Sequence, residues 1–421
     1  SALKSAGTTI INNGDNAGIK GNPGALDARY HVDLLLQPPL ETGVATAHYI
    51  KGQLELWAAS PAPDMALNAV ARATGVSHDN IILHSVFGGG GFEQKLDPLV
   101  MTVAAQAALR LKRPVHVFRS RGEENSQSLN AGGAVSRMTG QALPDGRIIG
   151  WQAHIAAPPG AEVLRARITD NRAPRRALRR LDGALPADVA HTAPPPYAIA
   201  NINIEIHPVN LDVPTGIIRG KSDNYTCFFN ESFINELATG AGIEPLSFRM
   251  GLLGDQPRLA QCLTKAGALA GWQGGAQGSH QGLACHSTGL AMIAVIAEAQ
   301  IDANGQISVR KLSAVADIGQ AINPDVARQQ IEGGLMFGLG LALGVPSQVR
   351  NGYTIPRKLG QLHLPQLQNT PEIVVDLVIS HEKSADAWDL AVPPVAPAVA
   401  AALFAGSGRR TRSLPLKSAS E

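Results

Sequence analysis

Apolar residues recur at helical spacing along several stretches of the chain. Such spacing places them on one face of a helix, which can then pack against a core. It predicts helices over 63–73, 97–112, 228–239, 258–269 and 324–343. Gly75, directly after the first stretch, suits a helix end. Shorter apolar runs at 80–87 and 115–119 are typical of strands.

Two further stretches are organised around a turn sequence. The first, 138–155, turns at Asp145-Gly146, and the second, 298–315, turns at Asn304-Gly305. Asp-Gly and Asn-Gly favour the tight turns of β-hairpins, so both stretches predict hairpins. Helices that alternate with strands and hairpins predict an α+β fold with mixed sheets and several subdomains.

A run of glycines, Gly88–Gly91, lies between the predicted strand at 80–87 and the predicted helix at 97–112. Backbone amides of a glycine turn at a helix N-terminus suit a phosphate or pyrophosphate group. A tight strand-to-helix turn without a ligand has the same pattern. Both interpretations stay open at this point.

Composition narrows the functional classes. With 421 residues, 44% of them hydrophobic, the chain can bury a large core. Lys and Arg number 36 against 34 Asp and Glu, which gives no support for a nucleic-acid partner. No apolar run reaches the about 18 residues of a membrane helix. We therefore expect a protein without a membrane span, in the cytoplasm or periplasm.

The three cysteines, Cys227, Cys262 and Cys285, lie far apart in the sequence. Their spacing fits neither a zinc nor an iron–sulfur site, and an odd, scattered count argues against a disulfide framework. We expect buried free thiols and predict no metal ligands among them. An iron–sulfur cluster, if the chain works with one, must then belong to a partner.

The segment Asp386–Val399 is similar to the C-terminal signature of the isoquinoline 1-oxidoreductase β-subunit group, the molybdenum-pterin subunits of the xanthine oxidase family. The family pattern is Gly-Val-Gly-Glu-Pro-Gly-x-Pro-Pro-x-Ala-Pro-Ala-Val, and its Glu is the catalytic base. Pro393–Val399 keeps the second half of this pattern. Asp389 takes the place of the Glu, and three glycines have become Asp386, Trp388 and Ala391.

Other motifs resemble the same family and follow in its order. They lie at 84–92, 117–124, 213–219, 229–237, 316–324 and 330–338. The resemblance implies a molybdenum-hydroxylase large-subunit-like fold. We expect a first molybdopterin-binding-like subdomain over 1–156, an Arg- and Pro-rich surface excursion over 157–197, and a second such subdomain over 198–421. The excursion could also be a docking surface for a partner subunit.

The resemblance also implies a function, which is hydroxylation of an N-heterocycle or an aldehyde with oxygen derived from water. Asp389 would be the base. The molybdenum-pterin cofactor would be held by Gly88, Gly89, Gly90, Gly91 and Phe92, assisted by Arg219 and Gln330. The expected partners are an upstream chain, which corresponds to the family's preceding third, a small iron–sulfur subunit and a small-molecule substrate. His286 also matches a family position.

Departures from the family pattern keep other roles open. Asp389 is shorter than Glu by about 1.5 Å of carbon chain, Trp388 adds bulk beside it, and Asp389 could be a plain structural acid. Glu93 would repel a nearby pyrophosphate unless Lys95 compensates. Arg219 could serve in a surface salt bridge, Gln330 could be a packing residue, and His286 a core histidine.

Two alternative functions follow from these departures. In the first, Ser1 is an N-terminal nucleophile with its own α-amine as base, exposed by self-cleavage, because the α-amino pKa of about 7.7–8.0 suits that role. The chain would then be an amide hydrolase without a cofactor. Ser1 could equally be an ordinary chain end. In the second alternative, the chain is a catalytically inactive scaffold subunit.

Overall fold

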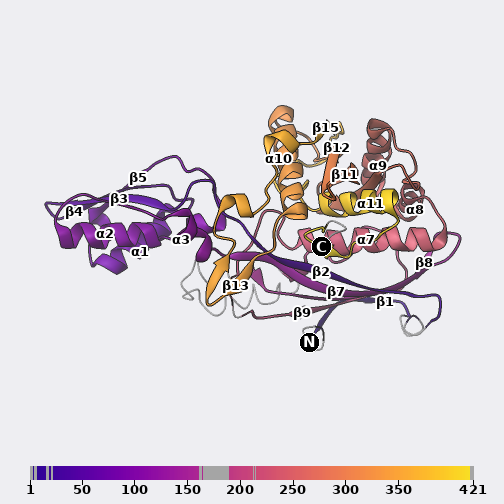
Figure 1. Cartoon of the computed structure of the whole chain (residues 1–421), viewed down its shortest axis with the longest axis horizontal. Helices are drawn as coiled ribbons and strands as arrows, with labels where there is room; N and C mark the ends of the chain where they lie inside the picture. Colours follow the sequence, from indigo (N-terminus) through magenta and orange to yellow (C-terminus); the bar gives the residue numbers. More distant parts are fainter. Residues whose placement is uncertain are drawn as a thin grey trace.

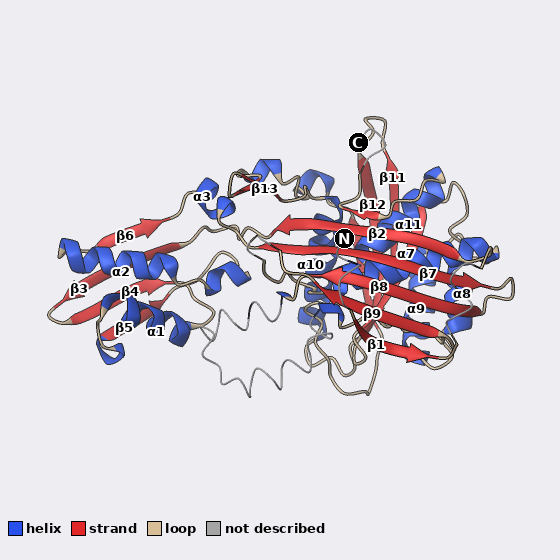
Figure 2. Ribbon diagram, turned by 90° about the horizontal axis from the view of Figure 1, so that it is seen from below, coloured by secondary structure: helices blue, strands red, loops and turns tan. Residues whose placement is uncertain are grey.

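The computed structural model describes residues 3, 7–15, 19, 22–160, 164, 189–211, 213 and 215–417. These residues form two lobes (Figure 1). The small lobe, residues 43–119, is one sheet covered by two helices. The large lobe comprises the other described residues and contains two larger sheets with helices packed on them (Figure 2).

The sheet of the small lobe has the strand order β5-β4-β3-β6. Its strands are β3 (Val44–Ile50), β4 (Gln53–Ala58), β5 (Ile81–Ser85) and β6 (Val115–Phe118). Helices α1 (Pro63–Thr74) and α2 (Leu99–Leu111) cover one face. Small side chains such as Ala47, Ala104 and Ala108 are fully buried there, so the helices approach the sheet closely.

The first sheet of the large lobe has six strands in the order β1-β9-β8-β7-β2-β16. They are β1 (Thr8–Asn13), β2 (Leu26–Leu36), β7 (Asn130–Ala142), β8 (Ile148–Ala157), β9 (Ile202–Pro208) and β16 (Ser413–Leu414). Helix α7 (Asp223–Ala241) packs on one face. There the ring of Trp151 meets that of Phe233 edge to face, with centroids 5.0 Å apart.

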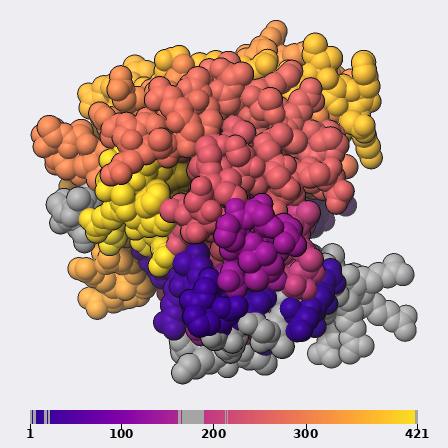
Figure 3. Space-filling model, turned by 90° about the vertical axis from the view of Figure 1, so that its right-hand side faces the viewer, coloured from indigo at the N-terminus to yellow at the C-terminus, as the bar shows by residue number. Residues whose placement is uncertain are grey.

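The turn between β7 and β8 contains Gly146, whose φ angle is +89°. An added Cβ atom at Gly146 would lie 3.1 Å from Ile243 Cδ1, so the turn packs against the residues that follow α7. Figure 3 faces this end of the molecule and shows the turn between the N-terminal segments and the 240–270 region. The predicted hairpin over 138–155 is confirmed.

The second large sheet has the order β10-β11-β12-β15. Its strands are β10 (Gln281–Ser287), β11 (Met292–Ile301), β12 (Ile307–Asp317) and β15 (Glu372–Leu377). Helices α9 (Pro257–Ala270), α10 (Pro324–Leu343) and α11 (Val395–Ser407) pack against it. The remaining elements are α3 (Arg121–Ser126), α8 (Pro245–Leu252), β13 (Gln348–Arg350) and β14 (Tyr353–Ile355).

All the predicted helices and hairpins are present. Most of them begin or end a few residues away from the predicted positions. The α+β fold with mixed sheets is therefore confirmed. The six-stranded sheet combines strands from both sides of the predicted excursion at 157–197, because β8 pairs with β9. Most of that excursion lies outside the described residues. Within the described part of the chain, we find no helix long and apolar enough to cross a membrane.

Candidate functional site

Arg219 connects three segments that are distant in the sequence. Its Nε and Nη2 atoms donate hydrogen bonds to the carbonyl oxygen of Trp388, at 2.9 and 2.7 Å. Nη2 also donates to the carbonyl oxygen of Gln330 at 3.1 Å. The guanidinium lies over the rings of Trp388 and Phe337, 5.5 and 5.9 Å from their centroids. Burial lowers the pKa of Arg219, and the nearby carboxylates of Asp389 and Asp386 oppose that shift.

Asp389 is held by the loop that carries Arg219. Its Oδ1 accepts a hydrogen bond from the backbone N–H of Gly220 at 3.0 Å, and its Oδ2 lies 3.0 Å from Lys221 Nζ. The Asp389 side chain is 22% exposed, so it is accessible from one side. Gly220 has a φ angle of +88°, and an added Cβ atom would lie 2.2 Å from Asn224 Oδ1. Only glycine therefore fits this position.

A cavity of about 550 Å³ opens beside Asp389. Glycine backbone and the loop before α7 form much of its wall, and its acidic groups are Asp386, Asp389 and Asp223. The lining residues are Gly132, Pro158, Gly160, His191, Gly216, Ile217, Ile218, Lys221, Ser222, Asp223, Tyr225, Thr288, Leu290, Ala385, Asp386, Asp389 and Leu390. Trp388 is absent from this wall. Trp388 is 56% exposed, and its ring lies against the Arg219 guanidinium.

Asp223, the first residue of α7, contacts the buried His286. Asp223 Oδ2 lies 3.4 Å from His286 Nε2, and Oδ1 accepts a hydrogen bond from Thr192 Oγ1 at 3.0 Å. Burial raises the pKa of Asp223, but the partners His286, Thr192 and His191 together outweigh it, so the pKa is lowered. Sequence reasoning missed Asp223 and Lys221, because the predicted helix began at residue 228 and left both in a loop.

The glycine run lies between β5 and α2. A short 3-10 helix, Glu93–Leu96, separates it from α2, so the run does not lead directly into the helix N-terminus. The backbone N–H of Gly89 donates to Glu41 Oε2 at 2.8 Å. Lys95 Nζ lies 3.0 Å from the same oxygen. The hydrogen bond from Gly89 lowers the pKa of Glu41, with Lys95 contributing.

Glu93 and Lys95 contact different segments of the chain. Glu93 is buried, and its Oε2 accepts a hydrogen bond from the backbone N–H of Ile217 at 2.5 Å. Lys95 pairs with Glu41 instead. The ring of Phe92 stacks on Phe337 with centroids 6.2 Å apart. Glu93 thus connects the segment after the glycine run to the loop that carries Arg219, and Phe92 connects it to α10.

The structure brings Arg219, Gln330, Phe92 and Asp389 into one region, with Phe337 between Phe92 and Arg219. Gln330 takes part through its backbone carbonyl. A second, more apolar cavity of about 350 Å³ is lined by residues that include Phe92, Ile218 and Phe337. Ser1 lies outside the described residues.

Comparisons with known proteins identify the family. Molybdopterin cofactor-binding domains match residues 5–251 and 264–371. The β-subunit of isoquinoline 1-oxidoreductase from Brevundimonas diminuta is 24% identical over 401 residues, which cover 92% of this chain and 49% of that protein. One nicotinate dehydrogenase subunit, from Pseudomonas putida, is 24% identical over 430 residues, covering 97% of this chain and 36% of that protein.

This chain thus spans half or less of the length of these two relatives. Among solved structures, quinoline 2-oxidoreductase from Pseudomonas putida 86 aligns with a TM-score of 0.73. The alignment covers 97% of this chain and 77% of that chain at 14% identity, which shows a shared fold. Because the first matched domain covers more than half of its length, the chain belongs to the molybdopterin cofactor-binding family, among the large subunits of the xanthine oxidase family.

Proposed function

We propose that the chain is the cofactor-binding part of a molybdenum-dependent oxidoreductase that hydroxylates an N-heterocycle or an aldehyde with oxygen from water. One observation carries the proposal. Asp389, at the position of the family's catalytic base, lies in the wall of the 550 Å³ cavity and is fixed by Gly220 and Lys221. The names of the relatives above support an oxidoreductase and give no support to the amide hydrolase or the scaffold.

The cavity fits a molybdenum-pterin group by size and by the nature of its wall. Ligand pockets usually measure about 300–1,000 Å³, and this cavity lies within that range. Gly132, Gly160 and Gly216 leave backbone at its wall, where a ligand can approach closely. Lys221 lies in the same wall together with Asp223, Asp386 and Asp389, so the fit rests on size and exposed backbone and not on charge.

In this proposal the glycine run also contacts the cofactor, but the Gly89 contact requires a change of hydrogen-bond partner. Gly88, Gly90, Gly91 and Phe92 stay proposed cofactor contacts. Gly89 would have to exchange the carboxylate of Glu41 for an anionic group of the cofactor, because its N–H is already bonded. Arg219 and Gln330 would assist by holding the turn around Trp388 in place through the observed hydrogen bonds.

When bound, a molybdenum-pterin group supplies the two-electron redox chemistry. Asp389 then acts as the base that takes a proton from the water-derived oxygen. Position decides whether a base works, and the hydrogen bond from Gly220 to Oδ1 fixes the direction of the carboxylate. Lys221 Nζ lies 3.0 Å from the other carboxylate oxygen, Oδ2, and helps to hold the side chain in place. The ring of Trp388 does not obstruct this step, since it lies over Arg219.

The proposed partners follow from the same function. The electrons must leave the site, and we propose a small iron–sulfur subunit as their acceptor. We also propose that a polypeptide corresponding to the preceding part of the relatives completes the enzyme, because this chain spans 49% and 36% of the two relatives.

The test uses the protein purified from its host with all associated chains. We expect molybdenum near one atom per chain and oxidation of N-heterocycles or aldehydes. Asp389→Asn should keep the molybdenum and lower turnover by about 10²–10⁴-fold, the usual contribution of a general base. Asp386→Asn is the matched control, because Asp386 lines the same cavity without the Gly220 contact. It should retain most of the turnover.

Unchanged turnover in Asp389→Asn would overturn the assigned base. Absence of molybdenum, in a preparation whose other molybdenum enzymes are loaded, would overturn the proposed function. Assays on amide substrates would follow in that case. Alongside them, a Ser1→Ala substitution in a longer precursor would show whether the chain end arises by self-cleavage.

A further inference from the structure

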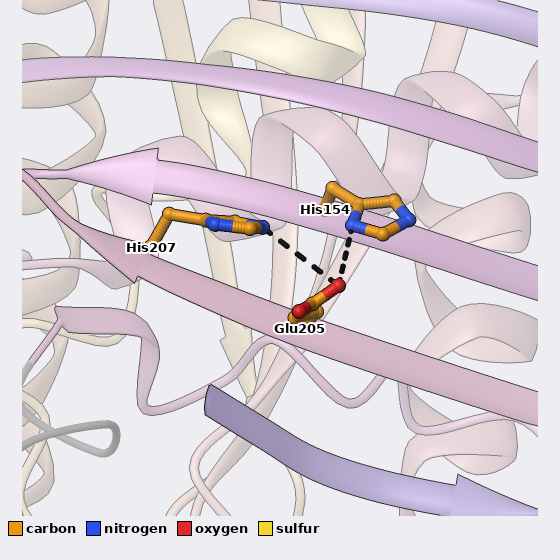
Figure 4. A group of neighbouring side chains, drawn as sticks. All are labelled: His154, Glu205 and His207. Carbon is orange, nitrogen blue, oxygen red and sulfur yellow. Dashed lines mark ion pairs between the residues drawn. The ribbon is translucent and has the colours of Figure 1, made fainter. Parts of the chain in front are cut away.

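Two histidines and a glutamate gather on the six-stranded sheet, away from the cavity of Asp389. His154 lies on β8, and Glu205 and His207 lie on the neighbouring strand β9 (Figure 4). His154 Nδ1 is 2.9 Å from Glu205 Oε2, and His207 Nε2 is 3.9 Å from the same oxygen. One ligand atom from each of the three residues lies within 4.8 Å of the other two.

The sheet holds these side chains on one face. β8 and β9 pair in parallel, with His154 opposite Glu205 and Ala156 opposite His207. Because side chains alternate along a strand, all three point to the face opposite Ile204 and Ile206, which are buried against the core. Neighbouring strands that share a ladder of backbone hydrogen bonds keep such a set of ligand atoms in fixed register.

Backbone closes over part of the cluster. An added Cβ atom at Gly7 would lie 2.6 Å from His207 Cε1 and 2.7 Å from Glu205 Cγ, so the chain at Gly7 approaches both side chains closely. His207 is only 4% exposed, whereas His154 and Glu205 are 36% and 29% exposed. The group therefore has a sheltered side and an open side.

From this geometry we propose that His154, Glu205 and His207 bind a divalent transition-metal ion of the Zn²⁺ class. Two imidazoles and one carboxylate form a ligand set that suits zinc and similar ions. Ligand atoms about 2.1 Å from a tetrahedral ion lie about 3.4 Å apart. This spacing falls between the two observed separations of 2.9 and 3.9 Å. The open side leaves the fourth position to water.

A metal here would link β8 directly to β9. All three ligands come from these two strands. In the six-stranded sheet, β8 and β9 lie between β7 and β1. An ion that binds the folded chain and not the unfolded chain stabilises the fold by mass action. The site is independent of the proposed redox chemistry, because none of its residues lines the cavity of Asp389.

The test is a Zn²⁺ titration of the chelator-treated protein with its associated chains, by calorimetry and thermal unfolding. We expect one bound equivalent and a higher unfolding temperature with Zn²⁺. His154→Ala should weaken Zn²⁺ binding at least tenfold and abolish the temperature shift. Glu205→Gln should do the same, and it keeps the side-chain shape, so loss of folding is not expected to obscure the result.

His84→Ala is the matched control. His84 Nε2 also lies 3.0 Å from a glutamate oxygen, that of Glu55. Among the described residues, however, this pair has no third His, Cys, Asp or Glu close enough to complete a metal site. The control should bind Zn²⁺ like the wild type. Absence of a bound equivalent in the wild type, or equal binding by His154→Ala and His84→Ala, would overturn the proposal.

Discussion

At the scale of single residues, the three thiols are the most uniform feature of the chain. All three cysteines are free and buried. Cys285 Sγ lies 3.1 Å from the Tyr197 hydroxyl, and Cys262 Sγ contacts the Met292 carbonyl at 3.9 Å. Burial raises the pKa of Cys262 to about 12, with the charge of Asp317 adding to the effect. Burial likewise raises the pKa of Cys227 and Cys285.

These surroundings predict unreactive thiols in the folded protein. At pH 8 a thiol with a pKa of about 12 is thiolate in about one molecule in 10⁴, against about a quarter for an ordinary thiol. We expect no alkylation by iodoacetamide within an hour in native buffer. In denaturant, all three cysteines should be alkylated. Mass spectrometry of the intact chain counts the alkyl groups added in each case. Rapid native labelling of any of them would contradict the burial of that thiol.

The sequence allowed candidate site residues to be named but not their contacts. Asp389 and Arg219 were identified from their motifs, and both lie in one region of the structure. Gln330 was identified as a side chain, although its backbone carbonyl makes the contact. The partner of Lys95 is Glu41, more than fifty residues upstream. Local patterns carry no information on pairs at such separations.

At the scale of elements, the surviving half of the C-terminal signature is explained by packing. Pro394 precedes the first residue of α11, and residues 395–400 are all buried. Helix α11 packs against β10, where an added Cβ atom at Gly282 would lie 2.1 Å from the Ala402 nitrogen and 2.3 Å from the Ala398 oxygen. The small residues of the signature therefore serve the helix–sheet contact, whereas two of the altered residues, Asp386 and Asp389, line the cavity.

This contact makes a prediction for β10. Gly282→Ala should push α11 away from the strand, because the new methyl group meets backbone atoms that cannot move alone. Overpacking of this kind costs about 1–3 kcal/mol of unfolding free energy. Urea unfolding should show a lower midpoint with an unchanged slope.

Gly240→Ala is the matched control for Gly282→Ala. Gly240 lies near the end of α7, and an added Cβ atom there meets nothing within 4 Å. Alanine at such a helix position should leave the unfolding free energy unchanged or raise it by up to about 1 kcal/mol. Equal effects of the two substitutions would mean that β10 and α11 do not pack as closely as the structure shows.

Elements differed in how well the sequence predicted them. The long helices α9 and α10 were found because their apolar residues repeat at helical spacing, and the hairpins because their turns contain Asp-Gly or Asn-Gly. Strands β2, β3 and β4 were not predicted. In β3 the inward residues Ala45 and Ala47 give only a weak alternation of apolar and polar positions. In β2 the alternation over residues 26–34 is regular, so that strand could have been predicted from the sequence.

At the scale of the whole molecule, the small lobe is an insertion between two paired strands. β2 and β7 are antiparallel neighbours in the six-stranded sheet, yet residues 37–129 separate them in the chain. The ends of the lobe meet, since the backbone N–H of Arg119 donates to the Gly43 carbonyl at 2.9 Å. A hairpin pattern could not reveal this pairing, because the intervening segment is long and has a hydrophobic core of its own.

We therefore predict that a fragment of residues 38–127 folds without the rest of the chain. It contains the whole core of the small lobe and the contacts among Glu41, Gly89 and Lys95. It loses contacts with the rest of the chain, such as those of Glu93 with Ile217, of Phe92 with Phe337 and of Asn125 in α3 with the Pro356 carbonyl. Circular dichroism should show helix and strand, and urea should unfold the fragment in one cooperative step.

Two leucine substitutions distinguish a folded fragment from a loosely collapsed one. Leu54 is completely buried, whereas Leu111 is 55% exposed. In a folded fragment Leu54→Ala removes packed methyl groups and should cost about 2–5 kcal/mol, with little effect from Leu111→Ala. Similar effects of the two substitutions on stability, or a gradual unfolding transition in urea, would contradict independent folding. The lobe would then depend on the large lobe, and the loops that connect Glu93 to Ile217 and Phe92 to Phe337 would be part of its stability.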